Sequence, residues 1–157
     1  MIFLNKLLVK HLFVLGAKTP MEVPVELKRL VDGIFADTLA FASIQEASEV
    51  AGLVEVLQHR LDALAVEIVD NVDRCGCNTQ DGHSNVRSWS AFTCRTTGTE
   101  ASRRLSLAKA FRQLPTTAAR YRAGVLGREQ VGCLATACAS DRYGRLVVKS
   151  EADSQHH

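Results

Sequence analysis

The sequence predicts an all-α protein with one long amphipathic helix and several short helices. Two observations support this fold class: apolar residues recur at spacings of three and four, and helix-capping patterns precede several of these segments. The alternation of a half-buried strand is nearly absent, and its only candidate is the short segment 145–149. A length of 157 residues suits one domain, and ten glycines with three prolines exclude collagen-like and low-complexity chains.

Residues 1–21 are predicted as an N-terminal extension, residues 22–152 as the helical domain and residues 153–157 as a disordered tail. Lys6 and Lys10 interrupt the apolar extension, which therefore does not reach the ~18 apolar residues of a membrane span. Its uninterrupted apolar core is also shorter than the roughly 7–15 residues of a signal peptide. Met21 is an alternative start of translation. We therefore expect a cytoplasmic protein without a membrane segment.

The first predicted helix follows Pro24 and covers residues 26–36. The capping box Ser43-x-x-Glu46 then begins a long helix over residues 44–74. One apolar row of this helix has the spacing of a packed or coiled helix; it contains Ala47, Val50, Val54, Leu57, Leu61, Leu64 and Ile68. A second row widens the apolar face and contains Leu53, Val56, Val66 and Val69. Such a face favours packing between two neighbours or a dimer.

Shorter helices follow a glycine stop at Gly76 and a turn over residues 78–82. They are predicted over residues 85–94, 99–113, 116–123 and 127–139, with Asn85 and the capping box Thr97-x-x-Glu100 as N-terminal caps. The first of them is expected to bury Val86, Trp89 and Phe92, so Trp89 is interpreted as a core residue and not as a base-stacking one. The first two, joined by a turn that contains Gly98, resemble a helix-turn-helix.

The net charge of +2 is the sum of two unlike halves. Residues 22–73 carry eleven acidic and three basic residues, a net of −8, whereas residues 84–128 carry nine basic residues and Glu100, a net of +8. One interpretation is that the basic half binds the phosphates of DNA. The candidate nucleic-acid-binding residues are Arg87, Arg95, Arg103, Arg104, Lys109, Arg112, Arg120 and Arg122. The alternative is that these residues, together with Arg128, pair with the acids of the long helix or are solvated.

The cysteines and histidines predict neither a metal site nor a catalytic site. Five cysteines, an odd number at irregular spacing, indicate free thiols in a reducing compartment and no disulfide framework. A zinc set of Cys75, Cys77, His83 and Cys94 has the wrong spacing for a zinc finger. His83 lies in a turn without a partnered nucleophile, so we expect it to position the next helix. No cofactor is expected.

Several short motifs of the second half together resemble the actinobacterial 13E12-repeat family. They are Asp81-Gly82-His83, Val86-Arg87, Trp89, Ala101-x-Arg103, Ala108, Leu114-Pro115, Ala123-Gly124 and Glu129-Gln130-Val131. The similarity covers roughly residues 31–152 and is most specific over residues 61–131. The resemblance implies an all-helical domain of unknown function that usually precedes an HNH endonuclease module.

The sequence departs from this family in its chemistry. An HNH module needs a histidine base beside a set of metal ligands, whereas the histidines here stand at positions 11, 59, 83, 156 and 157, outside any such cluster. We therefore expect a non-catalytic, truncated member of an HNH-associated family that binds DNA through its basic half. The alternatives are an oligomerisation module that pairs with itself or with an intact HNH relative, and a gene remnant without function. No small-molecule substrate is expected.

Overall fold

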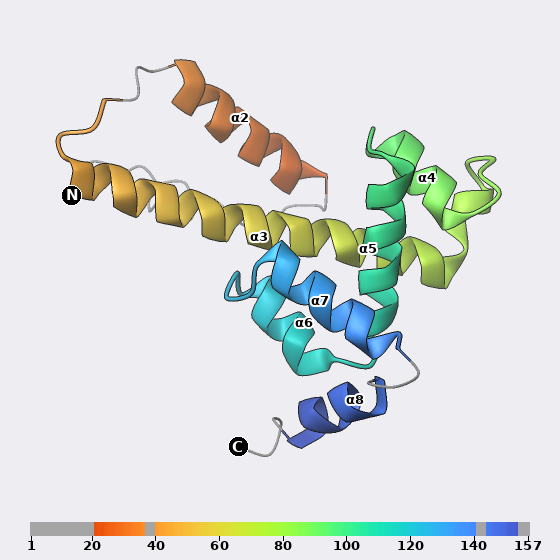
Figure 1. The fold of residues 1–157 in the computed structure, drawn as a ribbon. Coiled ribbons are helices and arrows are strands. Elements are labelled where there is room, and N and C mark those ends of the chain that lie inside the picture. Colours follow the sequence, from red (N-terminus) through yellow and green to blue (C-terminus); the bar gives the residue numbers. More distant parts are fainter. Residues whose placement is uncertain (1–20, 37–39, 141–143, 154–157) are drawn as a thin grey trace. The chain divides into compact units, whose positions relative to one another are not determined.

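The structure is a computed structural model that describes residues 21–36, 40–140 and 144–153 (Figure 1). Most of the predicted extension and tail, His11, His156 and His157 lie outside these residues. Within them all regular structure is helical, which confirms the all-α prediction. The helices are α2 (Glu22–Ala36), α3 (Ile44–Cys75), α4 (Val86–Thr93), α5 (Gly98–Phe111), α6 (Pro115–Arg122), α7 (Arg128–Cys138) and α8 (Gly144–Asp153), with a 3-10 turn, η1, at Cys77–Thr79.

The chain forms two compact units that divide after Glu46. The first unit contains α2, whose surface carries the ion pairs Lys28–Asp32 and Arg29–Glu26. It also contains the start of α3, where Ser43 Oγ accepts a hydrogen bond from the Glu46 amide at 3.1 Å. The capping function predicted for Ser43 is therefore confirmed.

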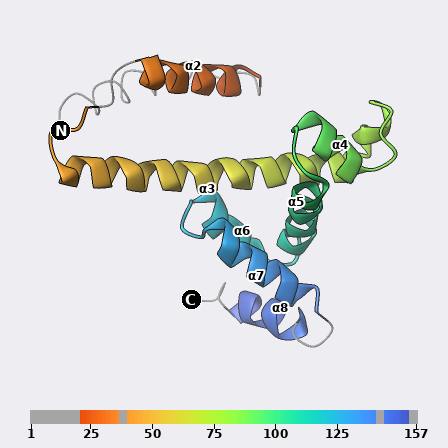
Figure 2. The ribbon, with the colours of Figure 1, turned by 45° about the horizontal axis from the view of Figure 1, so that its top comes forward.

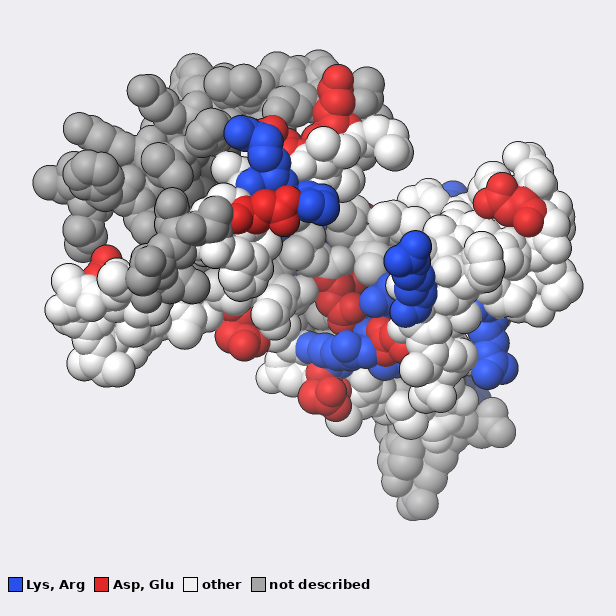
Figure 3. All heavy atoms as spheres, turned by 90° about the horizontal axis from the view of Figure 1, so that it is seen from above, with Lys and Arg blue, Asp and Glu red and all other residues white. Residues whose placement is uncertain are grey.

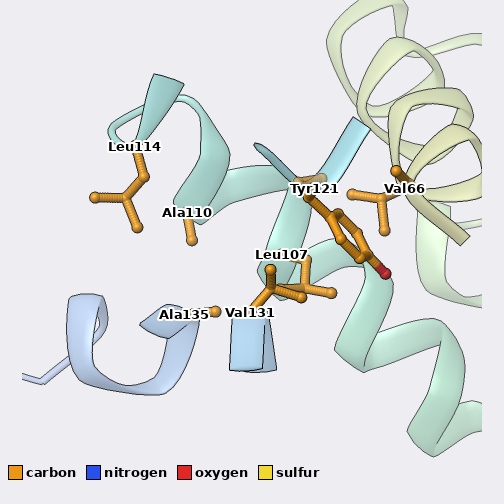
Figure 4. Close-up of a cluster of buried hydrophobic side chains, with 9 residues drawn as sticks. Val66, Leu107, Ala110, Leu114, Tyr121, Val131 and Ala135 are labelled. Atoms are coloured by element: carbon orange, nitrogen blue, oxygen red, sulfur yellow. The ribbon is translucent and has the colours of Figure 1, made fainter. Parts of the chain in front are cut away.

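The second unit contains most of α3 and all later helices. Figures 1 and 2 show α5, α6 and α7 gathered on the C-terminal half of α3, with α8 beside α7. Their apolar faces meet in one core (Figure 4), which consists of Ala63, Val66, Leu107, Ala108, Ala110, Leu114, Tyr121, Val131 and Ala135. Many of these side chains are small, which lets the helices approach closely.

Local capping fixes the ends of the short helices as the sequence predicts. The Asn85 side chain accepts a 2.8 Å hydrogen bond from the Ser88 amide at the start of α4. Thr97 Oγ1 accepts one of 3.1 Å from the Glu100 amide at the start of α5. Gly76 has φ +65°, the left-handed conformation that ends α3.

The only strand candidate of the sequence, residues 145–149, is helical, because these residues belong to α8. Val147 and Val148 both pack against the core, and Glu151 is buried against α6. A strand would turn Val147 and Val148 to opposite faces, whereas a helix brings positions three and four apart to one side. The pairing of α8 with the core, more than its β-branched residues, decides its conformation.

Two predicted burial patterns also need correction. In α4, Val86 and Ser90 are buried and Trp89 is half-buried, but Phe92 is 76% exposed. Val86 and Ser90 are four positions apart and therefore share one face of the helix, whereas Phe92, six positions after Val86, lies on another face. In α3, the buried residues are Ala63 and two members of the second row. The first row is exposed over much of its length, and its exposed members are Val54, Leu57, Leu61, Leu64 and Ile68, here called the α3 apolar row.

Candidate functional site

Ion pairs between the basic half of the chain and α3 dominate the polar surface of the second unit. Five arginines of the basic half pair with five carboxylates: Arg103, Arg104, Arg112, Arg122 and Arg128 with Asp62, Glu67, Asp70, Asp73 and Glu100. Figure 3 accordingly shows basic and acidic side chains next to one another on this face, not an unbroken basic surface. The interpretation that arginines pair with the acids of the long helix is confirmed for Arg103, Arg104, Arg112 and Arg122. Arg128 pairs instead with Glu100 of α5.

The most enclosed of these contacts surrounds the Asp62 carboxylate. Its Oδ2 accepts hydrogen bonds from the Tyr121 hydroxyl at 2.6 Å and from Arg103 Nη2 at 3.0 Å. Tyr121 is fully buried, and Figure 4 shows its ring beside the aliphatic side chains of the core. Burial, together with the hydrogen bond to Asp62, raises the pKa of Tyr121 above its ordinary value of 10. Tyr121 therefore remains a neutral hydrogen-bond donor at physiological pH.

Glu100 is the second centre of the network. It accepts hydrogen bonds from Arg103 at 2.8 Å and Arg104 at 2.9 Å, and it also pairs with Arg128. The hydrogen bond from Arg103 is the main cause that lowers the Glu100 pKa to about 2. The arrangement holds α5, α3 and the start of α7 together through groups that are charged at neutral pH.

Further along α3 the pairs are more exposed. Arg112 contacts Asp70 and Asp73, at 2.7 Å each, and Arg122 pairs with Glu67. Exposed pairs of this kind contribute about 0–1 kcal/mol each. Their larger consequence is that they reduce the positive charge offered to a nucleic acid.

The structure thus divides the eight predicted nucleic-acid-binding residues into two groups of four. Arg103, Arg104, Arg112 and Arg122 are paired with carboxylates. Arg87, Arg95, Lys109 and Arg120 are exposed and form no ion pair with the described part of the chain; Arg87 instead donates to the Gly98 carbonyl at 3.2 Å. The second group comes from α4, the α4–α5 connection, α5 and α6.

The α3 apolar row lies on the side of the helix opposite the second unit's core. Successive positions on an α-helix are 100° apart, so Leu57, Leu61 and Leu64 point away from Val66 and Val69. The five side chains of the row are 44–53% exposed, although all are leucine, isoleucine or valine. A row of this length on one helix face is a candidate contact surface for another helix.

Three members of the zinc set that the spacing disfavours form other contacts. Cys75 and Cys77 form a disulfide, and the His83 ring packs against Phe92 at a centroid distance of 5.4 Å. Within the described ranges no group of three or more His, Cys, Asp or Glu is placed to hold a metal ion. The prediction of free thiols holds for Cys94, Cys133 and Cys138 but is wrong for Cys75 and Cys77, because the Gly76 turn brings their sulfur atoms together.

Glu151 is a buried residue whose role was not predicted from the sequence. Its carboxylate in α8 accepts hydrogen bonds from the Thr117 amide at 2.7 Å and the Thr117 hydroxyl at 2.8 Å. These groups lie in the first turn of α6, whose N-cap residue is Leu114 and has no capping side chain. A carboxylate 34 residues away therefore supplies the missing cap. The only sequence signal for such a partner is that α6 begins without a capping side chain of its own.

These features define a small helical domain in which one long helix holds a cluster of short helices through a compact core and an arginine–carboxylate network. A profile of the family named Domain of unknown function (DUF222) matches residues 48–154. The chain belongs to the DUF222 family, which is the 13E12-repeat family that its motifs resemble. Comparisons with curated proteins and with solved structures find no significant match. Within the described residues, no helix is long and apolar enough to cross a membrane.

Proposed function

We propose that this chain is a non-catalytic DUF222 domain of an HNH-endonuclease-associated protein, and that it binds a second copy of itself through the α3 apolar row. The proposal rests on the exposure of this row, which lies opposite the domain's own core. The association with HNH nucleases rests on the sequence resemblance. In this proposal, any HNH chemistry belongs to a partner chain.

The spacing of the row supports a helix as its partner. From Val54 to Ile68 the residues are separated by three, four, three and four positions, the repeat of a two-helix seam. A second α3 carries the same repeat, so the two rows can interdigitate. Together with the flanking Leu53 and Val56 the row offers roughly 500 Å² of apolar side chain per chain, close to what the smaller specific dimers bury.

Charges beside the row favour an antiparallel pair of α3 helices. Arg60 and Glu67 stand one heptad apart on the same flank of the row, and Arg60 forms no ion pair with the described part of the chain. In an antiparallel pair this flank faces its counterpart, so Arg60 of one copy approaches Glu67 of the other. A parallel pair would not bring these two charges together.

The environment of the described histidines supports a non-catalytic role. His59 lies against Gly127, where an added Cβ would stand 3.3 Å from the imidazole ring. His83 packs on Phe92. Both histidines thus take part in packing, whereas an HNH base acts beside its metal ligands.

The proposal is tested by the mass of the full chain in solution, measured by light scattering after size-exclusion chromatography at about 50 µM. We expect a dimer for the native chain and a monomer for Leu57→Glu and Leu64→Glu, because a buried charge opposes the seam. Leu146→Glu is the matched control, since Leu146 is 63% exposed on α8 and lies outside the row. A monomeric native chain, or a dimer that persists in both row variants, would overturn the proposal.

A second candidate function is salt-dependent binding of duplex DNA through the unpaired cations Arg87, Arg95, Lys109 and Arg120. It is favoured because these four side chains are exposed and not neutralised by described carboxylates. The test is fluorescence anisotropy of a labelled duplex at about 50 mM salt, with alanine at all four positions as the variant. Binding that is weakened at least tenfold supports this function, and equal binding by both proteins contradicts it.

A further inference from the structure

Two cysteines at the end of α3, Cys75 and Cys77, lie outside the α3 apolar row. Cys75 is the last residue of α3, Cys77 begins η1, and the two are disulfide-bonded. Their Cα atoms are 5.3 Å apart, within the usual range for disulfides. Gly76 between them has φ +65°, a conformation that turns the chain back on itself and that other residues rarely adopt.

We propose that Cys75-Gly76-Cys77 is a reversible thiol–disulfide exchange site that reacts with low-molecular-weight disulfides. Cys75 is exposed, so a small disulfide can reach its sulfur, while Cys77 is half-buried. The Cys77 amide donates to Cys75 Sγ at 3.2 Å. A hydrogen bond from the same amide in the reduced protein would favour the Cys75 thiolate, the form that attacks disulfides.

The exchange runs in two balanced steps. The Cys75 thiolate attacks one sulfur of the small disulfide, forms a mixed disulfide and releases one small thiolate. The Cys77 thiolate then attacks Cys75 Sγ, forms the Cys75–Cys77 disulfide and releases the second small thiolate. Two cysteine thiols are oxidised and one small disulfide is reduced to two thiols.

The short ring favours reversible chemistry over a structural role. A disulfide stabilises a fold mainly by closing a long loop in the unfolded chain, and this one closes over a single intervening residue. Its Gly76 turn lies in open space, since an added Cβ would meet no atom within 4 Å. The site is therefore free to open and close without disturbing the core.

The test counts reactive thiols in the folded full chain after equilibration with either oxidised or reduced glutathione, followed by acid quenching, maleimide labelling and intact mass. After reduced glutathione we expect five maleimide adducts. After oxidised glutathione we expect Cys75 and Cys77 to carry neither maleimide nor glutathione, whereas Cys94, Cys133 and Cys138 each carry either maleimide or one glutathione. Peptide mapping should place the disulfide at Cys75–Cys77. Five adducts under oxidising conditions, or a disulfide mapped to another pair, would overturn the proposal.

Two variants make the test specific. Cys77→Ser should retain one glutathione on Cys75, because the resolving thiol is gone, whereas the control Cys94→Ser should still form the Cys75–Cys77 disulfide. Gly76→Ala should shift the equilibrium toward the dithiol, since alanine disfavours the left-handed turn by about 1 kcal/mol, roughly fivefold. Unchanged exchange in both Cys77→Ser and Gly76→Ala would contradict the assigned roles. The dimer measurement is independent of these outcomes.

Discussion

The Tyr121 hydroxyl donates a 2.6 Å hydrogen bond to the Asp62 carboxylate, and this contact connects the core of the second unit to the acidic face of α3. Arg103 donates to the same carboxylate oxygen at 3.0 Å. The three residues come from α6, α3 and α5, so one carboxylate holds three helices at fixed distances. Because Tyr121 is fully buried, its hydroxyl loses its hydrogen-bond acceptor within the chain if Asp62 is removed.

Replacing Asp62 with alanine should therefore destabilise the fold. We expect Asp62→Ala to lower the free energy of unfolding by about 2–4 kcal/mol, because the buried Tyr121 hydroxyl loses its acceptor and Arg103 loses one of its two carboxylate partners. Urea unfolding followed by circular dichroism measures the change. Glu55→Ala is the control, since Glu55 is an exposed acid on the same helix, and its effect should stay within about 0.5 kcal/mol. Equal stability of the two variants would contradict the role of Asp62.

The Glu100 carboxylate should make stability depend on pH. Its pKa is lowered from 4.5 to about 2 in the folded chain, so its stabilising effect is present above pH 4.5 and is lost as the pH falls toward 2. We expect Glu100→Gln to be less stable than the native chain at pH 7. This difference should shrink as the pH falls from about 5 toward 2. Urea unfolding at several pH values tests this, and a difference that stays constant would argue against the assignment.

The cap that Glu151 of α8 supplies to α6 should contribute measurably to the free energy of unfolding. Glu151→Ala leaves the Thr117 amide and hydroxyl without their acceptors, so we expect a loss of about 1–3 kcal/mol in unfolding free energy. In a double-mutant cycle with Thr117→Ala, the two changes should not be additive. Asp153→Ala, an exposed change at the end of α8, is the control. Additive effects of Glu151→Ala and Thr117→Ala would show that the two side chains do not interact.

The sequence predicts the helices well because their signals are local. Ser43, Asn85 and Thr97 cap helices through amides three residues away, and such contacts depend on little else. The charge asymmetry of the two halves leaves open whether the arginines bind phosphates or pair with α3, and it does not indicate which residues meet. Arg103 and Asp62 are 41 positions apart, and no periodicity marks them as partners.

The errors share a cause, since each depends on what packs against the segment. Residues 145–149 have β-branched side chains, yet burial of Val147, Val148 and Glu151 on one side makes them helical. The apolar row of α3 has the right spacing for a core seam, but in this chain the core uses Val66 and Val69 instead. Spacing indicates which residues share a face, whereas the structure decides which face is covered.

Gly124 should tolerate alanine less well than Gly82, although both have a left-handed backbone with φ near +77° and +76°. A Cβ on Gly124 would lie 2.8 Å from Val56 Cγ1 and 3.0 Å from the Val56 carbonyl oxygen, whereas a Cβ on Gly82 meets nothing within 4 Å. Gly82→Ala should therefore cost about 1 kcal/mol of backbone strain. Gly124→Ala should lower the free energy of unfolding by roughly 1–3 kcal/mol more than Gly82→Ala, because its Cβ would displace Val56 of α3. Equal losses in urea unfolding would mean that the α6–α7 connection shifts freely.

The neutralisation of Arg112 by α3 leads to a prediction about DNA. Replacing Asp70 and Asp73 with asparagine removes two negative charges and releases the Arg112 guanidinium from both of its carboxylate partners. It also removes the longer contact of 3.8 Å between Asp70 and Arg74. The double variant Glu55→Gln with Glu129→Gln makes the same change in net charge at exposed acids that hold no described arginine. If ion pairing masks Arg112, the Asp70 and Asp73 variant should bind a labelled duplex more tightly than this control. Its dependence on salt should also be steeper, by about one phosphate contact. Equal affinities and slopes would mean that only net charge matters, and that the arginine–carboxylate network does not limit access to phosphate.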